Sequence, residues 1–317
     1  MLNTPSFLLA RRLAPLLILG LLAACSGNGC GNCAVPAFHG AAPTPSPVPS
    51  LSPSPVPSPS SSAGSQVCNQ GASAIVLGPA LSTFAVLAGS GISNVGNTLV
   101  TFAPGAVTGG VNDDLMGVWP LSAVTGFYPP GTDTDGPNAI YAAGFNPNTA
   151  VPQAAQGALT TAYNTAAGLP ATATVAGDLS QAKVPGYPTG TLPPGVYKSS
   201  STLGIMAGNL TLDGAGNPQG VFVFQVGSAL TTTFNGGASG NVIVTNGASP
   251  CNVFWQIGSS ATLGGATFYG NVLAFSSITI NATTFTGRAL AGGSALGTGA
   301  VSIPVAGGSL ITNPGGQ

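Results

Sequence analysis

The chain has 317 residues, and only 3% of them are charged, against about 25% in an average soluble protein. Glutamate is absent, His39 is the only histidine, and lysine and arginine together number five. This composition excludes electrostatic binding of nucleic acid, which requires clustered lysine and arginine, and it leaves few groups for acid–base catalysis.

The N-terminal segment is typical of an export signal. Arg11 and Arg12 are followed by the apolar run LAPLLILGLLAAC, which is too short to span a bilayer as a mature anchor. Its last four residues, ending at Cys25, resemble the lipobox of bacterial lipoproteins. The resemblance implies a signal peptide over residues 1–24, a lipid on Cys25 and attachment to a membrane through that lipid. The residue after this cysteine is Ser26 rather than aspartate, and by the same resemblance this implies the outer membrane or the cell surface. The alternative is a plain secretory signal and a secreted protein.

Residues 25–66 contain the lipidated cysteine and a linker. The stretch PTPSPVPSLSPSPVPSPSSSAGS has proline at nearly every second or third position, which predicts an extended, semi-rigid spacer. We therefore expect one folded domain over residues 67–317. An oxidising compartment favours disulfides over a metal site, so we expect Cys68 to pair with Cys251, with free buried thiols as the alternative.

The folded domain begins with strands and contains one long helix. Residues 82–96 alternate apolar and small side chains, which predicts two short strands around Gly89–Gly91, and residues 104–150 are rich in turns. Residues 152–168 begin with proline and end with glycine, as a helix does. The side chains expected on its apolar face are Ala155, Ala158, Leu159, Ala162, Tyr163 and Ala166.

From about Gly195 the sequence becomes repetitive. The segments 252–270, 271–287 and 288–303 align as turns of about seventeen to nineteen residues, and 220–233 is an earlier copy. A period near eighteen with glycine corners predicts a parallel β-helix, in which stacked coils share one core. In this alignment Asn252, Asn271 and Arg288 open equivalent segments.

Alternation along the repeats predicts the direction of each side chain. The residues expected to point inward are Leu263, Phe268, Ile278, Ile280, Phe285 and Leu296, and those expected to point outward are Thr262, Thr267, Thr279, Asn281 and Thr284.

Catalytic and metal-binding constellations are missing from the sequence. The six aspartates, two lysines and Arg288 of the folded domain do not recur on adjacent repeats, and His39 lies in the linker, so we expect no enzyme activity. Asp113–Asp114 and Asp133–Gly136 offer only fragments of a calcium loop and are interpreted as loop-capping residues. We expect no metal and no cofactor.

Several segments of the folded domain resemble the ice-binding (antifreeze) protein family of polar bacteria, fungi and algae. They include STFAVLAGSGISNVGNT (82–98), LPPGVY (192–197), LTLDGAGNPQGVFVFQVGSALTT (210–232), CNVFWQIGSSATLGGATFYGNVLAFSSITI (251–280) and the Gly-Arg-Ala-Leu of 287–290. The resemblance covers roughly residues 72–303 in the family's order. It implies an irregular right-handed parallel β-helix of triangular section with one long α-helix packed alongside.

The resemblance also implies a monomer that adsorbs to ice, with ordered water as its partner and a role in cold adaptation. A flat face rich in Thr, Ser, Ala and Gly would carry this activity, because charged groups hold hydration shells that fit an ice plane poorly. The expected ice-binding residues are Thr231, Thr233, Thr262, Thr267, Thr279, Thr283, Thr284 and Thr298. The alternative function is a cell-surface adhesin or structural β-helix module that binds glycan or protein.

Overall fold

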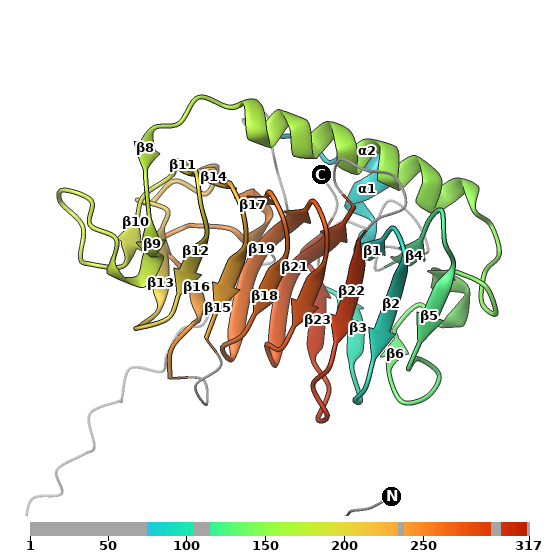
Figure 1. Ribbon diagram of the computed structural model, residues 1–317. Coiled ribbons are helices and arrows are strands. Elements are labelled where there is room, and N and C mark those ends of the chain that lie inside the picture. Colours follow the sequence, from blue (N-terminus) through green and yellow to red (C-terminus); the bar gives the residue numbers. More distant parts are fainter. Residues whose placement is uncertain (1–74, 104–114, 234–237, 293–298, 316–317) are drawn as a thin grey trace, which may run out of the picture. The chain divides into compact units, whose positions relative to one another are not determined.

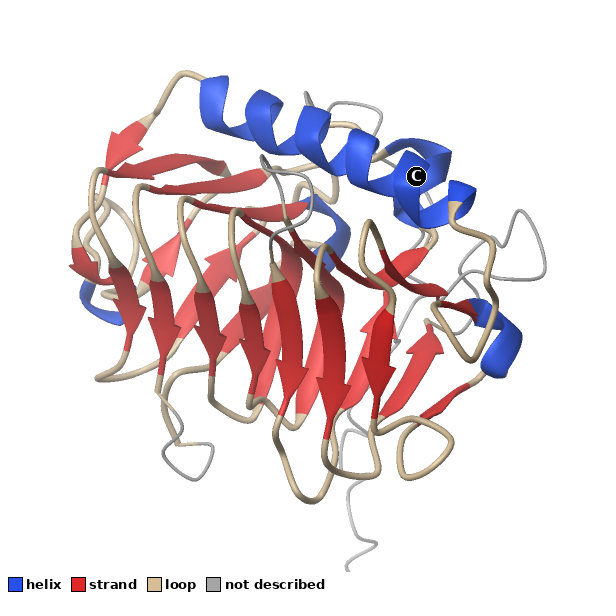
Figure 2. Cartoon of the chain, turned by 45° about the vertical axis from the view of Figure 1, so that its right-hand side comes forward, coloured by secondary structure: helices blue, strands red, loops and turns tan. Residues whose placement is uncertain are grey.

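The computed structural model describes residues 75–103, 115–233, 238–292 and 299–315, all within one compact unit that spans Ser61–Gln317. Parallel strands form sheets of twelve, eight and three strands that wind around the three sides of a β-solenoid, with one long helix along its length (Figures 1 and 2). The predicted parallel β-helix with a single long helix is therefore confirmed, and its right-handed winding stays a prediction.

The first side, the helix-covered face, lies beneath the long helix (Figure 1). In spatial order its strands are β8 (Ala173–Thr174), β11 (Gly195–Ser199), β14 (Phe222–Val226), β17 (Val253–Ile257), the second halves of β19 (Thr267–Ala274) and β21 (Thr284–Ala291), β1 (Phe84–Ala88), β4 (Leu115–Val118) and β7 (Ile140–Tyr141).

The second side, the eight-stranded face, is one continuous sheet. Its strands in order are β9 (Gly177–Asp178), β12 (Leu203–Ile205), β15 (Leu230–Thr232), β18 (Ala261–Leu263), β20 (Ile278–Ile280), β22 (Ala300–Ile303), β2 (Gly91–Asn94) and β5 (Ala123–Thr125).

The third face is divided between the three-stranded sheet and part of the twelve-stranded sheet, which bends onto this face through β19 and β21. One consists of β10 (Thr191–Leu192), β13 (Leu210–Asp213) and β16 (Val242–Thr245), and the other of the first halves of β19 and β21 with β23 (Leu310–Asn313), β3 (Leu99–Phe102) and β6 (Thr132–Asp133). The side chain of Asn241 joins the two sheets, because its Oδ1 accepts hydrogen bonds from the backbone N–H of Ala266 and Thr267 at 2.7 and 3.0 Å.

The spatial order of the coils differs from their order in the chain. Strand β1 pairs in parallel with β21, with Val86 opposite Ala289, so the first coil stacks on the last coil. After β7 the helix α2 (Ala150–Gly168) carries the chain back along the solenoid to β8 at the other end (Figure 1). The other helices in the described part of the chain are α1 (Gly78–Ser82) and three 3-10 turns at Pro137–Ala139, Leu179–Gln181 and Pro250–Asn252.

Two apolar layers hold these elements together. Inside the solenoid, the rings of Tyr197, Phe224, Trp255, Phe268 and Phe285 follow one another from coil to coil, with Phe224 and Trp255 stacked at 4.0 Å between ring centroids. Outside, α2 packs its buried Ala155, Leu159, Ala162 and Ala166 on Val223, Phe254, Leu273 and Leu290. Both layers follow from repeats too short to bury their apolar side chains alone.

Most predictions about individual elements are confirmed. Strands β1 and β2 flank Gly89–Gly91, α2 buries the expected face except for the half-buried Ala158, and Leu263, Phe268, Ile278, Ile280 and Phe285 are fully buried. Leu296 lies outside the described residues. The turn-rich segment also contributes the short strands β4 to β7, which the sequence did not predict.

One register prediction is wrong. Asn271 does pair with Arg288, but the residue opposite Asn271 on the preceding coil is Phe254 rather than Asn252. Asn252 ends the 3-10 turn before β17, where its Nδ2 donates to the carbonyl of Pro218. The register is decided by the inward apolar residues of β17, which leave the polar asparagine before the strand.

Candidate functional site

The eight-stranded face carries a row of hydroxyl side chains in strict register. Gly204 is paired with Thr231, and the row continues through Thr262, Thr279, Ser302, Ser93 and Thr125, one residue for each successive strand. Adjacent strands of a sheet lie about 4.8 Å apart, so the six hydroxyl residues form a regular linear array.

The row is held level by the side chains on either side of it within each strand. Leu230, Ala261, Ile278, Val301 and Ile92 point inward and are at most 2% exposed. The outward positions two residues before the row are small on β22, β2 and β5, where Gly91 lies between Ala300 and Ala123. Rigid inward anchors and small outward neighbours make the hydroxyl row the most prominent feature of a flat strip.

The threonine hydroxyls of this row are available to solvent. Within the parts of the chain that the structure describes, the side chains of Thr231, Thr262, Thr279 and Thr125 form no hydrogen bond to the protein. Ser93 and Ser302 differ, because the Ser93 hydroxyl donates to the Ser302 hydroxyl over 3.3 Å. Threonine is also restricted in its χ1 rotamer, so its hydroxyl and methyl are held in place before any ligand arrives.

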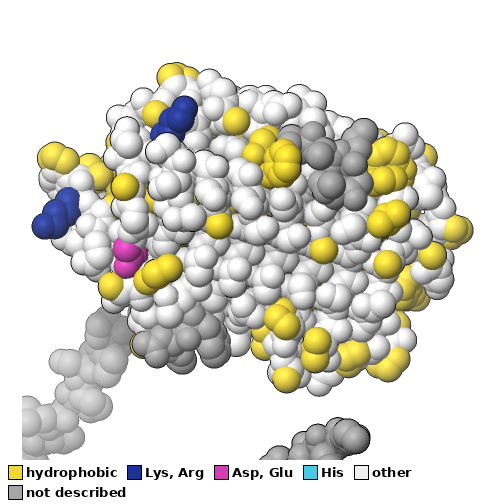
Figure 3. Space-filling view, in the orientation of Figure 1, with side chains coloured by type: hydrophobic (Ala, Val, Ile, Leu, Met, Phe, Trp, Pro, Cys, Tyr) yellow, Lys and Arg dark blue, Asp and Glu magenta, His cyan; other side chains and the backbone are white. Residues whose placement is uncertain are grey.

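Among the described residues, the charged side chains seen on the eight-stranded face lie at one end of it. Figure 3 looks onto this face, and the few lysine and aspartate side chains in view lie at the end that holds β8, β9 and β10. There Asp178 continues the row beyond Gly204. Partial burial opposes ionisation of its carboxylate, but hydrogen bonds from the backbone N–H groups of Ala207, Met206 and Ser180 and from the Ser180 hydroxyl prevail and lower its pKa.

The uncharged strip therefore ends at Thr231. A Cβ added at Gly204 would lie 3.0 Å from Cε of Met206, so the methionine covers this position of the row. A shallow hollow of about 340 Å³ lies beside it, lined by Gly177, Asp178, Thr202, Leu203, Gly204, Met206 and Thr231. Beyond this point the face is neither flat nor free of charge.

The predicted ice-binding threonines fall on two different faces. Thr231, Thr262 and Thr279 share the row on the eight-stranded face, whereas Thr267 and Thr284 are paired on the third face. Thr233 is half-buried just beyond β15, Thr283 donates its hydroxyl to the carbonyl of Ala266 at 2.9 Å, and Thr298 lies outside the described residues.

The third face presents a less uniform surface than the eight-stranded face. The row that contains Thr267 and Thr284 continues through Leu310 and Leu99 to Thr132. The two leucines are 39% and 38% exposed, so bulky apolar side chains interrupt the hydroxyls. Sequence reasoning missed Ser302, Ser93 and Thr125, because the coils that carry Ser93 and Thr125 lie far from the repeats in the chain. The alternation of Ile92, Ser93 and Asn94 is the local signal that could have placed the Ser93 side chain on the outside of its strand.

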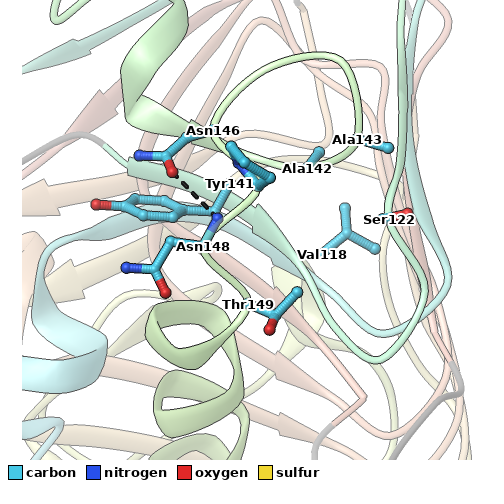
Figure 4. A pocket seen from close by; sticks show the side chains of 9 residues that line it. Val118, Ser122, Tyr141, Ala142, Ala143, Asn146, Asn148 and Thr149 are labelled. Atoms are coloured by element: carbon cyan, nitrogen blue, oxygen red, sulfur yellow. Dashed lines mark hydrogen bonds between the residues drawn. The ribbon is translucent and has the colours of Figure 1, made fainter.

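A second hollow, near the start of α2, has no charged residue in its lining. The lining of this cavity of about 210 Å³ includes Ser122, Tyr141 and Thr149 (Figure 4). Its Asn146 side chain is already engaged, since Oδ1 accepts from the backbone N–H of Asn148 at 3.1 Å and Nδ2 donates to the carbonyl of Asn138. Among the described residues, no three His, Cys, Asp or Glu side chains gather closely enough to hold a metal ion.

The other predicted features are tested only in part. Asp133 caps its own loop, with Oδ1 accepting from the backbone N–H of Asp135, while Asp113 and Asp114 lie outside the described residues. Cys251 is buried and disulfide-bonded, and since the described residues contain no other cysteine, its pairing with Cys68 stays a prediction. None of the helices in the described ranges has the length and apolarity needed to cross a membrane.

The model of the Ice-binding-like family matches residues 86–303 of the chain. An ice-binding protein of Nostoc sp. (strain HG1) is 41% identical over 210 residues, which span 66% of this chain and 65% of that protein. An ice-binding protein of Colwellia sp. is 38% identical over 133 residues, which span 41% of this chain and 47% of that protein.

Solved structures agree with this match. The crystal structure of an ice-binding protein from an Antarctic biological consortium is 35% identical with a TM-score of 0.58, covering 75% of this chain and 90% of that one. The structure of an ice-binding protein from the Antarctic ascomycete Antarctomyces psychrotrophicus is 30% identical with a TM-score of 0.54, covering 75% and 97%. Because the family model matches well over half of the sequence and the folds agree, the chain belongs to the Ice-binding-like family.

Proposed function

We propose that this protein binds ice by adsorption through its eight-stranded face and catalyses no reaction. The observation that carries the proposal is the register of Thr231, Thr262, Thr279, Ser302, Ser93 and Thr125 on one flat, uncharged strip. The relatives named above are ice-binding proteins, and the comparisons give no support to the alternative of an adhesin or structural module.

The chemistry of the row suits ordered water. Each threonine methyl restrains the water around it, and each hydroxyl anchors one water molecule through a hydrogen bond. Repeated at the strand spacing, these groups hold water in a fixed lattice that can join an ice surface. A stiff array loses little conformational freedom on adsorption, and the buried anchors Ile278 and Val301 provide that stiffness.

The eight-stranded face is favoured over the other two faces for specific reasons. The helix-covered face is closed to solvent along α2. The third face is divided between two sheets, and its row includes the exposed leucines Leu99 and Leu310. Among the described strands, only those of the eight-stranded face combine one continuous sheet with six hydroxyl residues in register.

The experiment compares ice growth in the presence of the wild type and two tyrosine variants. The wild type should shape ice crystals and show thermal hysteresis, and Thr262→Tyr should remove both effects, because a ring would lift the row away from ice. Thr284→Tyr, on the third face, is the matched control and should retain activity, with circular dichroism and thermal unfolding reporting that each variant folds. Unshaped crystals with the wild type would reject ice binding. Loss with Thr284→Tyr alone would reject the choice of face.

We also propose that the protein is exported, is tethered through a lipid on Cys25, and acts as a monomer. The lipobox-like residues before Cys25 and the proline-rich segment up to residue 66 support this arrangement. An extended spacer of this length would hold the ice-binding domain away from the lipid surface. Display on an outer membrane or cell surface would bring the eight-stranded face to external ice.

A further inference from the structure

We propose that Ser302 and Ser93 are the weak segment of the hydroxyl row and set the strength of ice binding; this inference rests on the proposed function. The two serines are paired with one another in the sheet and separate Thr279 from Thr125. They are the positions where the row lacks the methyl group that its four threonines carry.

The hydroxyls of the two serines are turned toward each other. Ser93 Oγ donates to Ser302 Oγ over 3.3 Å, so one donor hydrogen is used within the protein. The threonines of the row form no such contact among the described residues, and their hydroxyls remain free for water. Water above the serine pair therefore meets fewer outward donors than water above Thr262 and Thr279.

The serines are also less constrained than the threonines. Serine has no second heavy substituent on Cβ, so its hydroxyl moves among three staggered positions, whereas a β-branched residue has a restricted χ1. A mobile hydroxyl must be ordered when ice binds, which weakens adsorption. The absence of methyl groups also leaves the water between Thr279 and Thr125 without its apolar restraint.

The sheet has room for the missing methyls. Ser93 is exposed and Ser302 is half-buried, and their outward neighbours Gly91 and Ala300 are small. β-Branched residues also suit strands, so threonine at both positions fits the sheet. The variant Ser93→Thr/Ser302→Thr would complete six threonines in register from Thr231 to Thr125.

The test measures thermal hysteresis against protein concentration for the full chain and three double variants. Ser93→Thr/Ser302→Thr should shift the curve to lower protein concentration than the wild type. Thr262→Ser/Thr279→Ser should shift it to higher concentration, because it creates a second weak segment. Thr267→Ser/Thr284→Ser, which removes two methyl groups from the paired threonines of the third face, should leave the curve close to that of the wild type. Cooperative thermal unfolding serves as the folding check for every variant.

The outcomes separate this proposal from the proposed function. An active wild type whose Ser93→Thr/Ser302→Thr variant folds but shows no shift would overturn the role of the serines while leaving ice binding intact. A shift in Thr267→Ser/Thr284→Ser as large as that in Thr262→Ser/Thr279→Ser would also overturn it, since the loss of methyl groups would then act independently of the row. An inactive wild type would reject the proposed function itself, and this inference with it.

Discussion

Arg288 and Asn271 are paired on neighbouring strands, and Nη1 of the arginine donates to Oδ1 of the asparagine over 2.8 Å in the interior of the protein. The arginine is fully buried, and its Nε also donates to the carbonyl of Ser82 at 2.9 Å, while Nη2 donates to the carbonyl of Gly315. Asn271 in turn donates to the carbonyls of Cys251 and Val253. One guanidinium thus connects two coils with the end of α1 and the C-terminal segment.

Replacement of Arg288 by methionine should destabilise the fold without touching the eight-stranded face. The variant leaves the carbonyl of Gly315 and Oδ1 of Asn271 without the arginine donor, at about 1–3 kcal/mol for each buried group left unsatisfied, while the carbonyl of Ser82 keeps its hydrogen bond from Nδ2 of Asn313. The free energy of unfolding from chemical denaturation is the measurement. Lys198→Met, at an exposed cation, is the control and should change stability little; equal losses in both variants would contradict the role of Arg288.

Gly287→Ala should prevent folding, because Gly287 stands at the corner between the two halves of β21. A Cβ at this position would lie 1.9 Å from the carbonyl oxygen of Gly270 on the adjacent coil, where backbone has no room to move. Gly307→Ala is a matched control in a loop, since a Cβ there meets no atom within 4 Å. Soluble yield and circular dichroism distinguish the two, and a folded Gly287→Ala protein would disprove the close approach.

Gln225→Ala should loosen the docking of α2. Its Nε2 donates to the carbonyls of Ala166 and Leu169 at 2.8 and 2.7 Å, so it fixes the last turn of the helix on the helix-covered face. The loss removes this donor from the buried carbonyl of Ala166 and the partly buried carbonyl of Leu169 and should cost about 2 kcal/mol of stability. Faster hydrogen exchange in residues 162–168 than in the wild type is the expected signature. Gln153→Ala, at an exposed position of the same helix, should leave exchange unchanged.

Stability should fall at acid pH through Asp178. Its folded pKa lies below the ordinary value of 3.8, so the unfolded chain takes up a proton at higher pH than the folded protein. The stabilisation is complete above the ordinary value and is lost as the pH falls through the folded pKa. Denaturation midpoints at pH 7 and pH 3 should therefore differ more for the wild type than for Asp178→Asn. An identical difference in the two proteins would exclude this carboxylate as the cause.

Cys25→Ala should release the protein from membranes if the cysteine carries the lipid. In a bacterial host the wild type should sediment with the membrane fraction and incorporate labelled palmitate, and the variant should do neither. Cys30→Ala, five residues further along, is the control and should still sediment. A wild type found only in the soluble fraction would support the secretory alternative.

The sequence predicts this fold well where its signals are local. Thr262 and Thr279 lie seventeen residues apart and are paired, as the repeat predicted. Thr231 precedes Thr262 by thirty-one residues, because β16 and the turns around it lengthen that coil, and a fixed period cannot follow such an insertion. The alternation gave the outward direction of Thr267 and Thr284 but not their face, since a three-sided coil sends outward residues in three directions.

Ser93 and Thr125, on the first coils, could not be assigned to the row from the sequence for a different reason. Ser93 joins the row only because β22 pairs with β2, a contact between segments more than two hundred residues apart. No local pattern encodes which end of a solenoid accepts the first coil. The error at Asn252 has a related origin, because the inward apolar residues of β17 outweigh the apparent alignment of polar ones.

The stacking of the first coil on the last has a consequence for how the molecule forms. Residues 84–102 leave the ribosome early, yet β1 and β3 have no neighbour on one side until β21 and β23 have been synthesised. Contacts of such long sequence separation close slowly, and the open coil edges stay exposed in the meantime. Final assembly therefore requires the completed polypeptide, and a chain that stops short of Leu310 leaves β3 without its neighbour β23.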